Sequence, residues 1–194
     1  MDPSKFGDSY DIVKQAMLRW LIPLGTWAVH PMFAKDYRRS HPTFAAEFRR
    51  FLGAPVLTED PVPDKPQRAV YFEKSLCAFT QDHLFVDPDK GLALPESKWS
   101  KEHLTAQELC KIAHNHPGKL VLVYDQSFAH MGKDKRKCKT MCKLNWLKQR
   151  KLYGVAYFSH ANFLLVSEDE DMLEKAKRTL SVRLPDCRLI PVGN

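Results

Sequence analysis

The last third of the chain alternates apolar runs of strand length with segments of helical periodicity. Residues 120–124 form a continuous apolar run that ends in Tyr124, which is typical of a strand buried on both faces. The segments predicted after it are, in chain order, a basic helix over about 133–152, strands over 155–158 and 163–166, a helix that begins at 167–170 and a strand over 187–192. Such an alternation restricts the fold to helices packed against a sheet.

The order strand, helix, strand, strand, helix, strand is that of the ferredoxin-like split βαβ motif. We therefore predict an α+β fold in which residues 119–192 form a β-α-β-β-α-β layer, and the order leaves the pairing of the strands open. Upstream of this layer we expect a helical N-terminal region and a central hairpin. The hairpin is assigned to strand-like stretches at 69–72, 83–86 and 92–94, with turn residues at 87–91 before the last of them.

A stretch rich in proline and acidic residues interrupts the chain before the hairpin. Residues 55–67 hold four prolines and three acids, a composition that favours neither a central strand nor a helix. We therefore predict a helical region over 1–54, a linker over 55–67 and an α+β domain over 68–194. The chain has 194 residues, of which 44% are hydrophobic, and this is enough to bury a core of ordinary size.

Positive charge is concentrated in one segment. The whole chain carries a formal charge of +7, whereas residues 133–151 hold nine basic residues and one acid, so that this segment carries +8 and the rest of the chain −1. On a helix of about 100° per residue, four of these cations fall in one stripe beside an apolar face that includes Cys138 and Cys142. The stripe consists of Arg136, Lys139, Lys143 and Arg150.

Two interpretations of this stripe stay open. Lysine is a good helix former, so a solvated helix face explains the charges. Alternatively, the stripe binds an anionic partner, either nucleic acid or a phosphorylated ligand, through salt-sensitive contacts with phosphates. The chain contains neither a Walker A nor a GxGxxG spacing and no RNP-type aromatic signature. The first functional hypothesis is therefore a protein that binds nucleic acid or another polyanion through its basic helix.

A second functional hypothesis comes from the polar residues after the first apolar strand of this unit. Asp125 and Ser127 follow the strand, and His130 lies in the same loop. Strand ends commonly present reactive side chains, and these residue types bind metals or move protons. The alternative function is a metal-assisted hydrolase or nuclease centred on Asp125, with His83 or Asp87 as a partner. Because the chain lacks a GxSxG elbow, a purely structural loop cap also stays open.

The remaining candidates favour structural roles. Cys138 and Cys142 have the i, i+4 spacing of two metal ligands, but no second pair lies nearby in the sequence, so we expect two buried thiols on the apolar face. No metal site is predicted, and the sequence leaves the question of a cofactor open. The aromatic residues Trp20, Trp27 and Phe33 are expected in the N-terminal core, and a third hypothesis places them on an exposed patch of an interaction module.

The start of the chain and its cysteines bear on the cellular compartment. No apolar run follows Met1, and no stretch approaches the roughly 20 apolar residues of a bilayer-spanning helix. The five cysteines are odd in number and widely scattered, which is typical of reduced thiols. We therefore expect a cytoplasmic protein that does not insert into a membrane.

Overall fold

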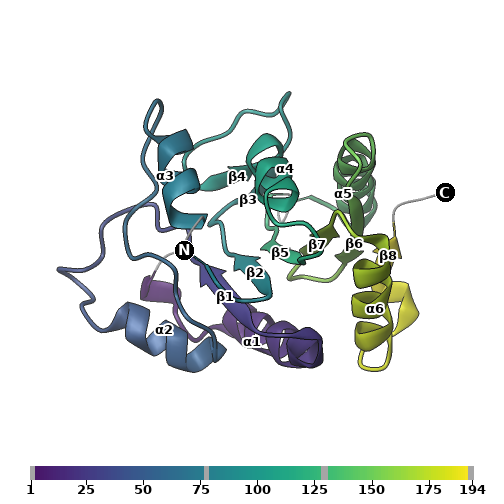
Figure 1. Cartoon of the computed structure of the whole chain (residues 1–194), viewed down its shortest axis with the longest axis horizontal. Coiled ribbons are helices and arrows are strands. Elements are labelled where there is room, and N and C mark those ends of the chain that lie inside the picture. Colours follow the sequence, from purple (N-terminus) through teal and green to yellow (C-terminus); the bar gives the residue numbers. More distant parts are fainter. Residues whose placement is uncertain (1–2, 77–78, 128–130, 192–194) are drawn as a thin grey trace.

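The chain folds around a mixed sheet of six strands. The computed structural model describes residues 3–76, 79–127 and 131–191 (Figure 1). The strands are, in spatial order, β1 (Trp27–His30), β2 (His83–Val86), β5 (Val121–Tyr124), β7 (Phe163–Ser167), β6 (Tyr153–Tyr157) and β8 (Leu189–Pro191). The first three are parallel, whereas β7 is antiparallel to β5 and β6, and β8 is antiparallel to β6. A separate parallel pair joins β3 (Gly91–Ala93) to β4 (His103–Thr105).

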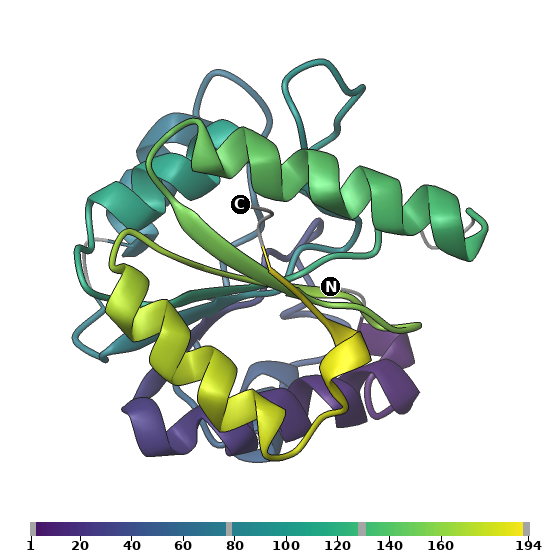
Figure 2. The same ribbon diagram turned by 90° about the vertical axis from the view of Figure 1, so that its right-hand side faces the viewer.

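Helices cover both faces of the six-stranded sheet (Figure 2). One face carries α3 (Arg68–Leu76), α4 (Ala106–His114) and α5 (Lys133–Lys148), and the other carries α1 (Ser9–Leu21), α2 (Phe44–Leu52) and α6 (Glu170–Ser181). The short 3-10 helices are η1 (Pro3–Lys5), η2 (Ile22–Leu24) and η3 (Asp186–Arg188). Along β5, Val121 and Val123 pack on the first face and Leu122 on the second. Burial on both faces is the reason that this strand is an uninterrupted apolar run.

The predicted α+β class and the element order of the C-terminal unit are confirmed: β5, α5, β6, β7, α6 and β8 follow one another along the chain. The position of β8 differs from the ferredoxin-like arrangement, in which the last strand returns beside the first. Here Leu189 and Ile190 pair with Tyr157 and Ala156 of β6, and β2 occupies the free side of β5.

The placement of α6 explains this difference. Helices α5 and α6 lie on opposite faces of the sheet (Figure 2). Crossovers between parallel strands share one handedness in nearly all sheets. A crossover helix on the opposite face therefore delivers its strand to the opposite side, which moves β8 from β5 to the outer side of β6.

The predicted central hairpin is wrong. Residues 69–72 belong to the helix α3, whose buried residues Arg68, Phe72 and Leu76 recur at helical spacing. Strand β2 pairs in parallel with β1 and β5 instead of turning back on β3, which pairs with β4. All four residues of β2 are buried, so the strand belongs in the interior of a covered sheet and not in a two-stranded hairpin.

The predicted helical N-terminal region also contributes a strand to the sheet. Val29 of β1 accepts a hydrogen bond from the backbone of Leu57 and donates one to Pro55, so the start of the proline-rich stretch runs alongside β1. The proposed division into 1–54, 55–67 and 68–194 stays a prediction. Trp27 and Phe33 are each 4% exposed, as expected for core residues, which removes them from any surface patch of an interaction module.

None of the helices in the described part of the chain is both long and apolar enough to span a bilayer.

His30, at the carboxyl end of β1, makes folding sensitive to acid. Its ring is fully buried against Tyr71 and Phe72, with Nε2 3.3 Å from Ser75 Oγ, and no described residue is a hydrogen-bond partner of Nδ1. Burial lowers the pKa of His30 from 6.5 to about 4. The unfolded chain therefore binds a proton here between pH 6.5 and 4 that the folded chain excludes, so stability is lost as the pH falls through this range.

We expect His30 to account for about 2 kcal/mol of the loss of unfolding free energy between pH 6.5 and 5. Urea unfolding at the two pH values, for the native chain and for His30→Leu, measures this contribution. The variant has a lower baseline stability because it changes the core, but its stability should depend less on pH. An equal pH dependence in both chains would contradict the assignment.

Candidate functional site

Helix α5 is basic but packs on a different side from the one that the sequence predicts. Its buried residues are Thr140, Lys143, Leu144 and Leu147. Cys138 and Cys142, predicted to be buried thiols, are both exposed. The predicted phase of the helical periodicity is wrong: it places Lys143 on a surface stripe, whereas the side chain of Lys143 is fully buried.

Lys143 is buried because it meets a carboxylate at the end of β5. Its Nζ donates to Asp125 Oδ2 at 2.6 Å and to Ser127 Oγ at 3.1 Å. The side chain of Asp125 is 4% exposed, so both charges of this pair lie inside the protein. The structure thus brings two predicted catalytic residues, Asp125 and Ser127, together with a residue predicted to bind anions.

Both oxygens of Asp125 are engaged by the protein itself. Oδ1 accepts from the backbone of Leu92 at 3.0 Å, from the backbone of Ser127 at 3.2 Å and from Ser127 Oγ at 2.7 Å. Burial raises the pKa of Asp125, but the Lys143 ammonium and these hydrogen bonds outweigh burial and hold the pKa below its ordinary value. A carboxylate with this set of donors fastens β3 and the loop after β5 to the helix α5, and it has no oxygen to spare for a metal ion.

Asp87 and His83, which were proposed as partners of Asp125, do not join this cluster. Asp87, at the end of β2, pairs with Lys14 of α1 on the opposite face of the sheet. His83 lies at the other end of β2, where its ring contacts the backbone of Leu24 and Leu120. His130 lies outside the described residues. Among residues 3–76, 79–127 and 131–191, no three His, Cys, Asp or Glu side chains are placed to hold a metal ion.

Two members of the predicted anion-binding stripe face inward. Lys143 is paired with Asp125, and Arg136 is half-buried, with Nη1 donating to the Ser159 carbonyl at 3.1 Å and its guanidinium 5.2 Å from the Phe158 ring. Lys139 and Arg150 remain exposed. The stripe of four residues is therefore not a single surface.

A different row of exposed cations follows one side of α5. Lys135 and Lys139 lie one helical turn apart, and Trp146 continues the same side. Arg150, just beyond the helix, places its guanidinium 3.4 Å from the Trp146 ring centroid and donates to the Trp146 carbonyl. We call Lys135, Lys139, Trp146 and Arg150 the basic row. Three further exposed lysines, Lys133, Lys137 and Lys148, lie on roughly the opposite side of the helix.

A second buried ion pair, formed by α1, is not among the sites predicted from the sequence. Lys14 and Asp11 occupy buried positions on the helix face that otherwise holds Met17, Leu18 and Leu21. Two opposite charges at i and i+3 inside an apolar stripe are a recognisable signal of a buried pair. Their third partner, Asp87, is distant in the sequence and became visible only in the fold.

Comparison of the chain with protein-family models, with curated proteins and with solved structures finds no match.

Replacement of Lys143 tests how much its ion pair with Asp125 contributes to the free energy of unfolding. Lys143→Met leaves a buried carboxylate without its counter-ion, so we expect a loss of about 3–5 kcal/mol in the free energy of unfolding. The matched control is Lys139→Met, an exposed position on the same helix, which should change stability by less than about 0.5 kcal/mol. Urea unfolding measures both, and the double variant Lys143→Met/Asp125→Leu should regain much of the loss. Similar values for the two single variants would refute this role of the pair.

Substitution of Gly91 tests how closely the backbone of β3 approaches the Asp125 side chain. Its φ is +86°, and a Cβ at this position would lie 2.2 Å from Asp125 Oδ1 and 2.7 Å from the backbone nitrogen of Gln126. Gly118 has a similar φ of +75° but open space around it. Gly118→Ala should therefore cost about 1–2 kcal/mol through backbone strain alone, and Gly91→Ala about 1–3 kcal/mol more through the clash. Equal costs in thermal or urea unfolding would show that the approach to Asp125 is looser.

Proposed function

We propose that the protein binds a polyanion, with nucleic acid as the favoured class, along the basic row of α5. The observation that carries this proposal is the alignment of exposed cations on one helix side. From Lys135 to Trp146 the row spans about 16 Å, at 1.5 Å per residue. A nucleic acid presents phosphates at regular intervals, so a linear row of cations can neutralise several of them and release their counterions.

The surroundings of the row support a docking role. None of the ion pairs between described residues involves Lys135, Lys139 or Arg150, so no described carboxylate neutralises these cations. The first turn of the helix contains one acidic residue, Asp134. The N-cap residue is Gly132, which has no side chain that could cap the free backbone amides. Lysines near a helix start are disfavoured by the helix dipole, so this arrangement does not serve helix stability.

The row provides phosphate contacts and no visible means of reading bases. Lysine and arginine that meet phosphates position a nucleic acid without selecting its sequence. The Trp146 ring, already stacked with Arg150, adds an aromatic surface beside the charges. We therefore propose salt-sensitive binding without sequence preference. No observation among the described residues favours the alternative, a metal-assisted hydrolase or nuclease, because Lys143 neutralises Asp125 and the proposed partners His83 and Asp87 lie elsewhere.

Two triple variants, each of which removes three positive charges, distinguish binding through the basic row from an effect of net charge alone. Lys135→Gln/Lys139→Gln/Arg150→Gln removes the row, whereas Lys133→Gln/Lys137→Gln/Lys148→Gln removes three charges from the other side of the same helix. For the first variant we expect a weaker affinity for duplex DNA. We also expect the slope of log K against log salt concentration to be smaller in magnitude by up to about 3. The second variant should change both much less.

Fluorescence anisotropy with a labelled duplex, over a series of salt concentrations, gives both quantities. Equal losses in the two variants would show that net charge alone drives binding. No binding by the native chain at low salt would overturn the proposal and leave a solvated helix face as the explanation of the lysines.

A further inference from the structure

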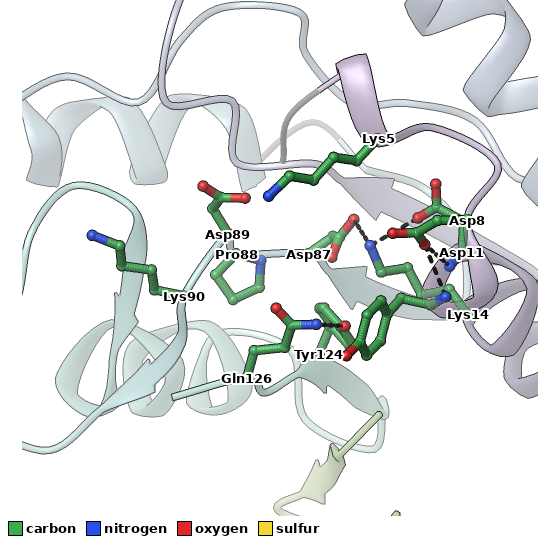
Figure 3. A pocket seen from close by; sticks show the side chains of 11 residues that line it. Lys5, Asp8, Asp11, Lys14, Asp87, Pro88, Asp89, Lys90, Tyr124 and Gln126 are labelled. Atoms are coloured by element: carbon green, nitrogen blue, oxygen red, sulfur yellow. Dashed lines mark hydrogen bonds and ion pairs between the residues drawn. The ribbon is translucent and has the colours of Figure 1, made fainter. Parts of the chain in front are cut away.

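A cavity of about 280 Å³ opens at the carboxyl ends of β2 and β5, beside the start of α1 (Figure 3). Its wall combines charged side chains with Tyr10, Tyr124 and Gln126. Sheets with parallel strands commonly bind ligands in the crevice outside the carboxyl ends of those strands. The cavity lies apart from the basic row, since it faces α1 and not α5.

Three buried charges form the inner wall of the cavity. Lys14 Nζ donates to Asp11 Oδ1 at 3.0 Å and to Asp87 Oδ2 at 2.9 Å. The residues are 5%, 3% and 1% exposed for Lys14, Asp11 and Asp87 respectively. Removing charges from water is costly, and an apolar cluster of the same volume is often equally stable. Charged groups buried in such clefts are candidates for ligand contact.

The Lys14 ammonium is already engaged on several sides. Besides its two carboxylate partners, it lies 4.4 Å from the centroid of the Tyr124 ring. Asp11 uses its second oxygen to accept from the backbone of Gly7. The ammonium therefore offers little to an incoming anion.

Asp87 offers an acceptor to the cavity. Oδ2 is bound by Lys14, but no hydrogen bond from a described residue reaches Oδ1. In Figure 3 this second oxygen points into the space between Asp87, Tyr124 and Gln126. A side chain that is 1% exposed and directs an unused carboxylate oxygen into a cavity provides a site for a hydrogen-bond donor.

Acidic side chains outnumber basic ones among the described residues that line the cavity. Four carboxylates line it, from Asp8, Asp11, Asp87 and Asp89, against three ammonium groups. The triad itself, with two carboxylates and one ammonium, carries an excess negative charge inside the protein.

We propose that this cavity binds a small organic cation with a primary ammonium group, which donates to Asp87 Oδ1 and packs against the Tyr10 ring. Aromatic faces together with carboxylates are a common combination for organic ammonium recognition. A metal ion fits less well, because no group of three ligating side chains is arranged for one within the described ranges. Binding here is independent of the basic row on α5.

A series of three probes of equal size and different charge tests the proposal on the native chain. Benzylammonium, benzyl alcohol and benzoate are each titrated into the ¹⁵N-labelled full chain at pH 7, with the backbone amides of Lys14, Tyr124 and Gln126 as readout. Benzylammonium should shift these amides saturably and bind at least about tenfold more tightly than the alcohol, while benzoate should not bind. Equal binding of the three probes, preference for benzoate, or no saturable shift would overturn the proposal.

A matched pair of variants locates the site. Asp87→Asn should weaken benzylammonium binding by about tenfold or more, because it removes the charge that faces the cavity. Asp125→Asn is the control: it changes the equivalent aspartate of the neighbouring strand, which is paired with Lys143 on the other face, and it should leave binding unchanged. A titration with Mg²⁺ on the same amides tests the metal alternative, and saturable Mg²⁺ binding there would overturn the assignment to an organic cation.

Should Asp87→Asn fail to fold, the probe series on the native chain still decides the question, because it requires no variant. Folding of both variants is checked by their thermal unfolding curves. Loss of benzylammonium binding in both folded variants would place the contact outside the cavity and would also overturn the proposal.

Discussion

Burial of the sheet on both faces determines where this protein can keep charge. A strand such as β5 is apolar along its whole length, so polar residues appear only after its end. The first polar residue there is still covered by a helix. Asp87 and Asp125 occupy this position in neighbouring strands, and each is 4% exposed or less. Each needs a cation from the helix that covers its own face: Lys14 of α1 for Asp87, and Lys143 of α5 for Asp125. The two pairs attach helices to opposite faces of the same sheet edge.

The two aspartates differ in how many hydrogen-bond donors of the chain reach their carboxylate oxygens, and this difference separates a structural role from a candidate ligand site. Both carboxylate oxygens of Asp125 accept hydrogen bonds from the chain, Oδ1 from the backbone of Leu92 among others and Oδ2 from Lys143. Around Asp87 one oxygen remains for a donor from outside, and a cavity leads to it. A strand-end carboxylate thus serves structure on one face and is open to a ligand on the other. The number of hydrogen-bond donors around the carboxylate distinguishes the structural role from the candidate ligand site. The position of the aspartate after a strand does not, because it is the same for Asp87 and Asp125.

Much of the C-terminal unit could be predicted from the sequence, because continuous apolar runs and helical periodicity are local signals. The pairing of β8 with β6 could not, since it depends on which face α6 covers. The segment 69–72 was misassigned because a few β-prone residues outweighed the helical spacing of Phe72 and Leu76 in a short window. For the candidate site, Asp125 and Ser127 were found by their place after a strand. The role of Lys143 was missed because a lysine on a basic helix is indistinguishable by pattern from its exposed neighbours until its partner is known.

The order of strands in the sheet also has a consequence for folding. The hairpin of β6 and β7 joins residues that are close in the chain, such as Tyr157 and Phe163, whereas β1 pairs Trp27 with His83. Loop closure over such a long separation costs more entropy, so contacts of this kind form late. β1 lies at the edge of the sheet, next to β2 alone among the six strands. We therefore expect the N-terminal segment to dock late, so that the Lys14–Asp87 contact, with the cavity beside it, is completed late in folding.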